Sequence, residues 1–244
     1  MKKNLIYGLH TVQAVLKRDF SQVKELWVDA GRKDKRIQTI LSMAGGITIH
    51  RVSKDDLDVL AAGANHQGVI AHVMTLDHLV SEEDLERLVE ARGEETFLLI
   101  LDGVQDPHNL GACLRSADAA GVDAVIVPRN NAVSITATVS KVACGAAETV
   151  PFIQVTNLVR TLRMLKDAGV WLVGADGTAK QSLYDIDLRG ALALIMGGEG
   201  EGLRRLTREN CDYLARLPMA GTVESLNVSV ATGICLFEAV RQRS

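Results

Sequence analysis

The chain has 244 residues, of which 47% are hydrophobic and 23% charged, and its net charge is −3. A chain of this length can form one or two hydrophobic cores, and we expect two domains. Its apolar runs are all shorter than the roughly 18 residues that a membrane-spanning helix needs, and no signal-like apolar segment follows Met1. These features argue against a membrane protein and predict a cytoplasmic globular protein.

The charge is unevenly distributed along the chain. Residues 1–75 contain 11 Lys and Arg against 7 Asp and Glu, whereas residues 76–244 contain 16 against 23. A basic first third in an acidic protein favours an anionic partner for that third. Chance variation over a small domain explains the charge split equally well.

Residues 1–75 show a compact α/β pattern. Strands are predicted at 24–28, 47–49 and 68–73, and helices at 11–18 and 53–61. Ser53 and Asp56 form a capping pattern at the start of the second helix. The basic residues cluster in the predicted strand-to-helix loop 31–36, which can contact phosphates, although a solvated loop is an equally good explanation.

The segment 76–95 is acidic and marks the predicted domain boundary. It holds eight acidic residues, opposed by Arg87 and Arg92. Ser81 can cap a short helix that runs to Val89, so we predict a structured linker here.

Residues 96–244 alternate apolar runs of strand length with helical patterns. The predicted strands are 97–101, 124–127, 150–153, 170–173 and 191–196, and the predicted helices are 110–120, 138–144, 158–168, 204–211 and a C-terminal helix after Asn227. This order predicts a parallel, doubly wound sheet. The C-terminal helix is apolar nearly all round, so we expect it to be buried on several sides.

A glycine-rich turn, residues 196–203, follows the last predicted strand. Open α/β sheets bind ligands at the carboxyl ends of their strands, and a second loop rich in Gly, Ser and Asn, 217–231, suggests a shared pocket. The glycines do not match the dinucleotide pattern, because Leu203 stands where its third glycine is required. Glu199 and Glu201 would repel a pyrophosphate. We therefore predict a ligand without phosphate, with the glycines allowing close backbone approach to a flat group, unless the turn is purely structural.

Two other site types receive little support. Ser225, His108 and Asp102 or Asp106 are the residue types of a hydrolase triad, but Ser225 lacks the G-x-S-x-G turn. The histidines show no metal-ligand spacing, so we expect no metal. The four cysteines, Cys113, Cys144, Cys211 and Cys235, contain no C-x-x-C pair and are interpreted as structural thiols.

Three segments together resemble the three motifs of the SpoU (TrmH-type) branch of the SPOUT methyltransferases. They are Asn109-x-Gly111-x-x-x-Arg115, the turn 196–203, and Leu217-Pro218-Met219 followed by 225–231. The resemblance covers residues 97–244, and residues 1–75 resemble the ribosomal-protein-like RNA-binding domain attached to many members. Within this branch the chain is most similar to bacterial enzymes that methylate a guanosine ribose 2′-hydroxyl in the peptidyl-transferase region of 23S ribosomal RNA.

The resemblance implies a fold, a cofactor and an assembly. The domain 96–244 would contain a trefoil knot near the C-terminus, bind S-adenosylmethionine in the knotted loops and form a homodimer. The cofactor would contact Gly197, Leu217 and Leu226, with Gly198, Met219 and the loop 174–176 nearby. The substrate would be 23S rRNA, held by the basic domain 1–75.

The resemblance also assigns catalytic roles. Arg115 would activate the ribose hydroxyl, and because a guanidinium rarely loses its proton we expect it to stabilise the developing alkoxide, with the proton passing to phosphate or water. The side chains that would orient Arg115 and the nucleotide are Asn109, Glu199, Ser225 and Asn227. Asn109 could also cap the following helix. Two alternatives stay open: a tRNA ribose methyltransferase of the same fold, and a non-catalytic RNA-binding or ribosome-assembly protein.

Overall fold

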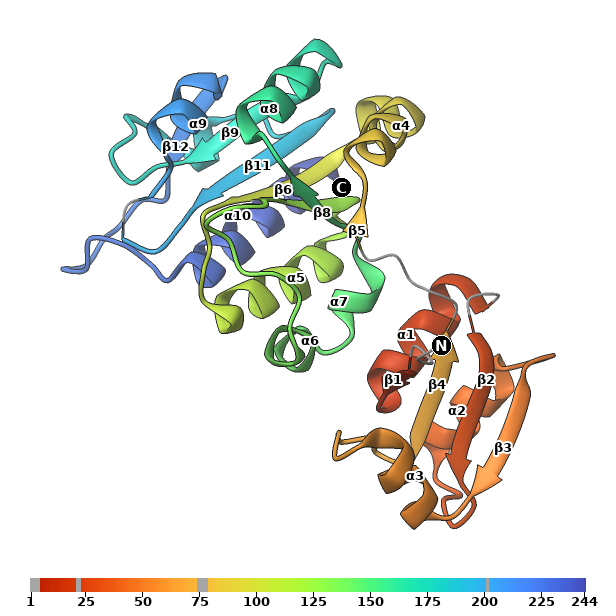
Figure 1. Cartoon of the computed structure of the whole chain (residues 1–244). Coiled ribbons are helices and arrows are strands. Elements are labelled where there is room, and N and C mark those ends of the chain that lie inside the picture. Colours follow the sequence, from red (N-terminus) through yellow and green to blue (C-terminus); the bar gives the residue numbers. More distant parts are fainter. Residues whose placement is uncertain (1–4, 21–22, 74–78, 201) are drawn as a thin grey trace. The chain divides into compact units, whose positions relative to one another are not determined.

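The computed structural model describes residues 5–20, 23–73, 79–200 and 202–244. Contacts divide the chain into two compact units, residues 1–77 with 144–149 and residues 78–143 with 150–244 (Figure 1). Within the described residues, no helix is long and apolar enough to cross a membrane. Glu201 and the first residues of the predicted acidic linker, 76–78, lie outside the described residues.

The first unit is built on a four-stranded mixed sheet in the order β1-β4-β2-β3. Its strands are β1 (Leu5–Tyr7), β2 (Val23–Asp29), β3 (Thr48–Val52) and β4 (Val69–Val73), and its helices are α1 (Leu9–Asp19), α2 (Lys35–Met43), α3 (Lys54–Ala61) and the short α7 (Ala146–Thr149). Side chains of α1 and α2, such as Val12 and Ile40, share one hydrophobic core with Leu26 of β2. Leu57 of α3 packs with Trp27 in a second cluster.

The predicted strands and helices of this unit are present, but β1 and α2 were not predicted. Ser53 and Asp56 form the expected capping box. The predicted basic loop is shorter than 31–36, because the Asp34 side chain accepts hydrogen bonds from the N–H groups of Arg36 and Ile37 and thereby starts α2 at Lys35. The basic run is therefore half loop and half helix.

The second unit is built on an eight-stranded sheet in which every pairing is parallel, in the order β10-β12-β9-β11-β6-β7-β8-β5. The strands are β5 (Leu79–Val80), β6 (Phe97–Asp102), β7 (Ala124–Pro128), β8 (Phe152–Val155), β9 (Trp171–Ala175), β10 (Gln181–Ser182), β11 (Leu192–Gly197) and β12 (Tyr213–Arg216). The helices are α4 (Glu82–Arg92), α5 (Pro107–Ala120), α6 (Ala137–Ala143), α8 (Leu158–Asp167), α9 (Arg205–Asn210) and α10 (Val228–Arg243), with 3₁₀ turns at Gly93–Glu95 and Leu183–Asp185. The predicted parallel α/β architecture is confirmed.

Helices cover both faces of this sheet. Figure 1 shows α4, α8 and α9 on one side and α5 and α10 on the other. Leu98 and Ile100 of β6 join Leu162 of α8 and Leu85 of α4 in one core cluster. Because β6 is buried along its whole length, its sequence is a continuous apolar run rather than an alternating one. Replacing one such leucine by alanine costs about 2–5 kcal/mol.

The strand order places a topological switch between β6 and β11. From β6 the chain continues to β7 and β8 on one side, then crosses to β9, and β11 returns between β9 and β6. Helices that follow β6 and β11 lead away from their carboxyl ends, so a crevice forms there. The segment 103–106 and the glycine-rich turn leave the sheet at this position.

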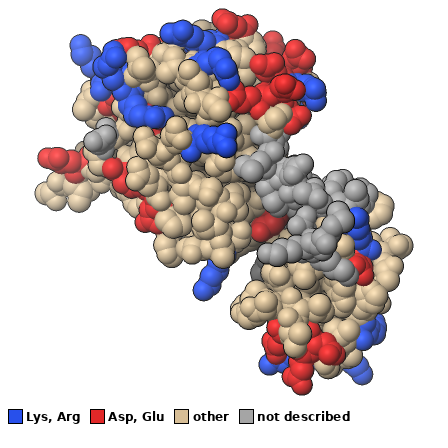
Figure 2. Space-filling view, viewed as in Figure 1, with Lys and Arg blue, Asp and Glu red and all other residues tan. Residues whose placement is uncertain are grey.

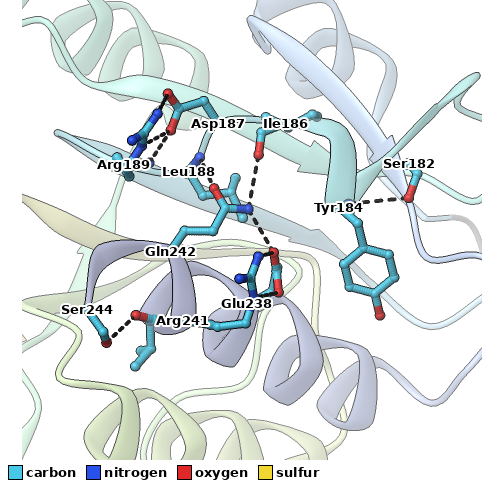
Figure 3. Close-up of polar contacts among 11 residues, drawn as sticks. Ser182, Tyr184, Ile186, Asp187, Leu188, Arg189, Glu238, Arg241, Gln242 and Ser244 are labelled. Atoms are coloured by element: carbon cyan, nitrogen blue, oxygen red, sulfur yellow. Dashed lines mark hydrogen bonds and ion pairs between the residues drawn. The ribbon is translucent and has the colours of Figure 1, made fainter.

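The end of α10 is anchored by a side-chain network (Figure 3). Gln242 accepts a hydrogen bond from Leu188 N at 2.9 Å and donates to Ile186 O at 3.2 Å. The buried Glu238 accepts hydrogen bonds from Arg241 and Gln242, and these lower its pKa from 4.5 to about 2. The network ties the C-terminal helix to the segment before β11.

Candidate functional site

The glycine-rich turn folds tightly back on itself and on β6. A Cβ atom at Gly197 would lie 2.1 Å from the carbonyl carbon of Gly202, and one at Gly198 would lie 2.4 Å from Gly103 O. Gly200 and Gly202 have φ values of 92° and 67°, which favour glycine. Gly197 and Gly198 thus allow close approach to other backbone of the same chain, whereas the sequence had suggested approach to a flat ligand.

A buried ion pair holds the turn against β6. The Asp102 carboxylate has no exposed area and accepts hydrogen bonds from Arg204 N at 3.1 Å and Arg204 Nε at 2.5 Å. Sequence reasoning missed this pair. The sequence did indicate that Asp102 has a partner, because an aspartate that ends a fully buried strand needs one. It did not identify Arg204, because the path of the turn decides which residue reaches the carboxylate.

The turn forms one wall of a cavity of about 640 Å³, which we call the switch-point pocket. Three segments line it, 175–177, 196–202 and 215–231, although not every residue in them contributes. The five residues predicted to contact a cofactor all lie on its wall: Gly197, Gly198, Leu217, Met219 and Leu226. Ala175 and Asp176 of the predicted nearby loop also line it, and so do Glu199 and Ser225.

The switch-point pocket is acidic. Asp176, Glu199 and Glu224 line it, and Arg216 is the one basic side chain among its described lining residues. Arg216 Nη1 donates to Ala179 O at 2.9 Å, which holds the guanidinium against a neighbouring loop. The pocket suits a cationic ligand better than a phosphate.

A directed chain of amide hydrogen bonds runs beside this pocket. Ser229 N donates to Asn227 Oδ1 at 2.9 Å, Asn227 Nδ2 donates to Asn109 Oδ1 at 3.0 Å, and Asn109 Nδ2 donates to Glu199 Oε1 at 2.7 Å. The backbone N–H of Ser229 can only donate, so it sets the orientation of both amides. The structure thus joins three of the predicted catalytic residues, which come from α5, the glycine-rich turn and the start of α10.

The structure places the other two predicted catalytic residues apart from this chain. Ser225 is exposed at the pocket wall, and Arg115 is exposed on α5 and does not line the pocket. Arg115 follows Asn109 by six residues, so the two side chains leave the helix about 120° apart. The helix is capped by Asp106, whose side chain accepts from His108 N at 2.7 Å, and not by Asn109.

The hydrolase alternative finds no support in this geometry. Asp102 is held by Arg204 and Asp106 caps α5, so both candidate carboxylates are already engaged. In the described ranges, no hydrogen bond joins Ser225 to His108.

The thiols and potential metal ligands show no reactive arrangement in the part of the chain that the structure describes. Burial raises the pKa of Cys113 to about 11 and those of Cys211 and Cys235 to about 12, so these thiols are protonated at neutral pH. Cys144 is exposed, and none of the four forms a disulfide. Among the described residues, no group of three or more His, Cys, Asp or Glu could hold a metal ion.

Comparison with known proteins identifies the family. Residues 96–237 match the model of the SpoU rRNA Methylase family, and residues 5–79 match a model described as RNA 2′-O ribose methyltransferase substrate binding. A curated relative from Vibrio cholerae is 57% identical over 245 residues, covering 100% of this chain and 98% of the relative. One from Escherichia coli is 56% identical over 242 residues, covering 98% and 99%. Both are named 23S rRNA (guanosine-2′-O-)-methyltransferase RlmB.

Solved structures agree with this assignment. The SpoU methyltransferase AviRb from Streptomyces viridochromogenes, solved with the cofactor AdoMet, superposes with a TM-score of 0.74 at 26% identity, covering 98% of this chain and 89% of that one. An AdoMet-bound rRNA methyltransferase from Sinorhizobium meliloti superposes with a TM-score of 0.72 at 27% identity, covering 97% and 86%. The family models and the full-length relatives together show that this chain belongs to the SpoU rRNA methylase family.

Proposed function

We propose that this chain uses S-adenosylmethionine to methylate the ribose 2′-hydroxyl of a guanosine in 23S rRNA. Relatives that are 55–57% identical over nearly the whole chain carry this activity in their names. The observation that carries the proposal within the structure is the acidic switch-point pocket with the Asn109–Glu199–Asn227 chain at its side.

The pocket fits the methyl donor. S-adenosylmethionine is a sulfonium with an adenine face and no phosphate, and the pocket combines three carboxylates with apolar side chains and glycine backbone. Leu217, Met219 and Leu226 would hold the flat adenine, while Gly197 and Gly198 would contribute backbone groups. When bound, the donor supplies a methyl group that the ribose 2′-oxygen takes from sulfur as that oxygen loses its proton.

The residues of this chain would position the ribose and its charge. A methyl transfer requires the 2′-oxygen to lie in line with the methyl carbon, so fixed hydrogen-bonding groups beside the pocket lower the barrier. Asn109 and Asn227 are pre-oriented by Ser229 N and can hold the nucleotide or Arg115 without reorganising. The Arg115 guanidinium would stabilise the alkoxide, and the proton would pass to a phosphate or to water. Ser225 would contribute a further hydrogen bond at the pocket wall.

We also propose that the working enzyme is a homodimer formed through the second unit. Arg115 does not line the pocket of its own chain, so a second copy is a natural source of the arginine. On α10, Val230 is 51% and Phe237 50% exposed, and with Ile234 they form one stripe of the helix. An apolar stripe of this kind favours an interface.

Three finer features of the fold belong to this proposal. We infer that the chain is knotted around the pocket; the sheet order supports this, since β11 lies between β6 and β9 while β12 lies on the far side of β9. We infer that residues 1–75 form a ribosomal-protein-like domain that binds rRNA, followed by a linker at 76–95. An rRNA substrate also favours a cytoplasmic location.

Mapping of ribose methylation in rRNA from cells that lack this protein tests the activity. We expect one guanosine of 23S rRNA to lose its 2′-O-methyl group, and the map also tests the expected location in the peptidyl-transferase region. An unchanged methylation pattern would contradict the proposal. The alternative of a tRNA methyltransferase is supported by a tRNA-modifying enzyme from A. aeolicus, which is 30% identical and covers 66% of this chain. Comparing methyl transfer to tRNA and to 23S transcripts distinguishes the two substrates.

Substitution of Arg115 separates the enzyme from a non-catalytic RNA-binding protein. Arg115→Ala is expected to lower kcat by about 100-fold, because it removes a charge that stabilises the alkoxide, while the affinity for S-adenosylmethionine changes little. Radioactive methyl incorporation measures the first quantity and calorimetry the second. Full cellular function with Arg115→Ala would favour the non-catalytic alternative.

A further inference from the structure

Some arginines at the carboxyl edge of the eight-stranded sheet form ion pairs with carboxylates of the protein, and others do not. Arg204 is held by the buried carboxylate of Asp102, and Arg208 pairs with Asp176 at 3.0 Å. These two arginines brace loops of the switch-point pocket. Arg129, directly after β7, is exposed, and in the part of the chain that the structure describes its side chain makes no hydrogen bond or ion pair.

A more conspicuous basic region is largely neutralised by its own acids. Figure 2 shows Lys and Arg side chains gathered over α8 and α9, and acidic side chains gathered near α4. The ion pairs in the basic region are Arg160–Glu82, Lys166–Asp212, Arg205–Glu209 and Arg208–Asp176. Such pairs leave little net charge for an anionic ligand, so the colour of this surface alone does not locate a phosphate site.

The backbone fixes Arg129 close to the predicted reaction centre. Arg129 N donates to Val155 O at 2.8 Å, so the ladder between β7 and β8 continues one residue past the strand. On its other side β7 pairs with β6, and the residue after β6, Gly103, meets the backbone of Gly198. Arg129 therefore lies about two strand spacings, roughly 10 Å, from the end of β11.

The loop after Arg129 is attached to the segment that contacts the glycine-rich turn. Val133 N donates to Val104 O at 3.1 Å, and Asn131 O lies 3.8 Å from the position of a Cβ atom on Gly103. Asn131 adopts a left-handed conformation with φ of 60°, which asparagine tolerates better than most residues. Arg129 thus stands at the start of a loop that is fixed to the segment next to the glycine-rich turn.

We propose that Arg129 binds a backbone phosphate of the substrate RNA next to the methylated nucleotide, an inference that rests on the proposed function. A ribose that reaches the switch-point pocket brings its phosphates to the carboxyl edge, where Glu199 and Glu224, which form no ion pair among the described residues, would repel them. An unpaired arginine at the same carboxyl edge, two strands from β11, offsets that repulsion for a phosphate that lies over β6 and β7. Its planar guanidinium can contact two phosphate oxygens at once. Arg129 acts as a positioning residue, because it holds the RNA backbone and not the reacting oxygen.

Binding of an unmethylated 23S rRNA transcript to the full-length protein tests the proposal. Arg129→Gln is expected to weaken binding about tenfold at moderate salt. It should also reduce the slope of log affinity against log salt concentration by about 0.7, the value for one phosphate contact on a single strand. KM for the transcript should rise while kcat and the affinity for S-adenosylmethionine stay near those of the wild type, and Arg129→Lys should restore part of the binding.

Arg87→Gln is the matched control, because Arg87 is an exposed arginine on α4 among acidic residues. An Arg129→Gln protein with the affinity and salt slope of the wild type would overturn the proposal. Equal loss from both variants would overturn it too, since the effect would then be one of net charge. Failure of the proposed function looks different: the wild type would bind the transcript without methylating it, and the binding comparison would still decide the role of Arg129.

Discussion

Asn109 joins the glycine-rich turn to the start of α10 through a single buried amide. Its Nδ2 donates to Glu199 and its Oδ1 accepts from Asn227, so both halves of the amide are used. No other side chain of similar size can donate and accept in these two directions at once. The residue is 8% exposed, which makes the loss of either bond costly.

Substitution of Asn109 by aspartate tests whether this chain positions catalytic groups. Asn109→Asp places a second carboxylate beside Glu199 and removes the donor, so we expect kcat to fall by about 100-fold or more. Binding of the rRNA transcript should change little. Methyl-transfer kinetics give kcat, and Asn210→Asp, which alters an amide on α9 that bonds to Leu206 O, serves as the control. Wild-type kcat in Asn109→Asp would contradict a catalytic role for the chain.

The sequence motifs predicted which residues line the pocket, but not which side chains bond to one another around it. Leu217 and Leu226 line the cavity as their motif position suggested, because the motif lies in loops whose backbone forms the wall. The Asp102–Arg204 pair could not be predicted, since 102 residues separate its members and only the folded turn brings them together. Arg115 was predicted at the site but lies away from the pocket of its own chain, and its role stays a prediction.

Among the helices and strands, α10 is stabilised by polar side chains at its C-terminal end. Glu238 is 9% exposed, and it accepts hydrogen bonds from Arg241 and Gln242 within the helix. Gln242 in turn bonds to Leu188 N and Ile186 O before β11. The carboxylate has a pKa of about 2, below its ordinary 4.5. A lowered folded-state pKa stabilises the fold fully above the unfolded value and loses that stabilisation as the pH falls toward 2.

Glu238→Gln should therefore lower the free energy of unfolding by about 1 kcal/mol at pH 7 and flatten its pH dependence below about pH 4.5. Urea denaturation of wild type and variant at pH 7, 4 and 3 measures the difference, which should shrink as the pH falls. Glu94→Gln, in the 3₁₀ turn Gly93–Glu95, is the control. A difference that stays constant from pH 7 to 3 would contradict the role of the charged carboxylate.

The length and burial of an element, and the residues that flank it, decided whether the sequence predicted it. The apolar runs of β6 and β11 are buried on both faces and stand out from their surroundings. β5 and β10 have only two residues each, and β1 has three, too few for any period to appear. β12 has four residues, of which only Ala215 is buried, so it lacks the continuous apolar run that marks β6 and β11. α2 was missed because its basic first turn reads as a continuation of the loop before it.

At the scale of the whole molecule, the two units divide charge as well as structure. The basic residues of 1–75 stand in a unit with its own core, whereas the acidic helix α4 packs Leu85 and Val89 into the core of the second unit. The predicted segment 76–95 is thus largely part of the second unit's packing, with Ser81 capping α4 as expected. It stays a prediction that residues 1–75 bind RNA and residues 96–244 carry out methyl transfer.

The proposed homodimer makes the sharpest prediction about the whole molecule. Phe237 is half exposed at the C-terminal end of the apolar stripe of α10, and a stable interface buries at least about 1,000 Å² of mostly well-packed surface. Phe237→Glu places a charge within that surface, so sedimentation should show a monomer, and methyl transfer should fall with it if Arg115 acts on the partner's pocket. Val59→Glu is the matched control, because Val59 is 80% exposed on α3 of the first unit. A dimer that survives Phe237→Glu at micromolar concentration would place the interface elsewhere.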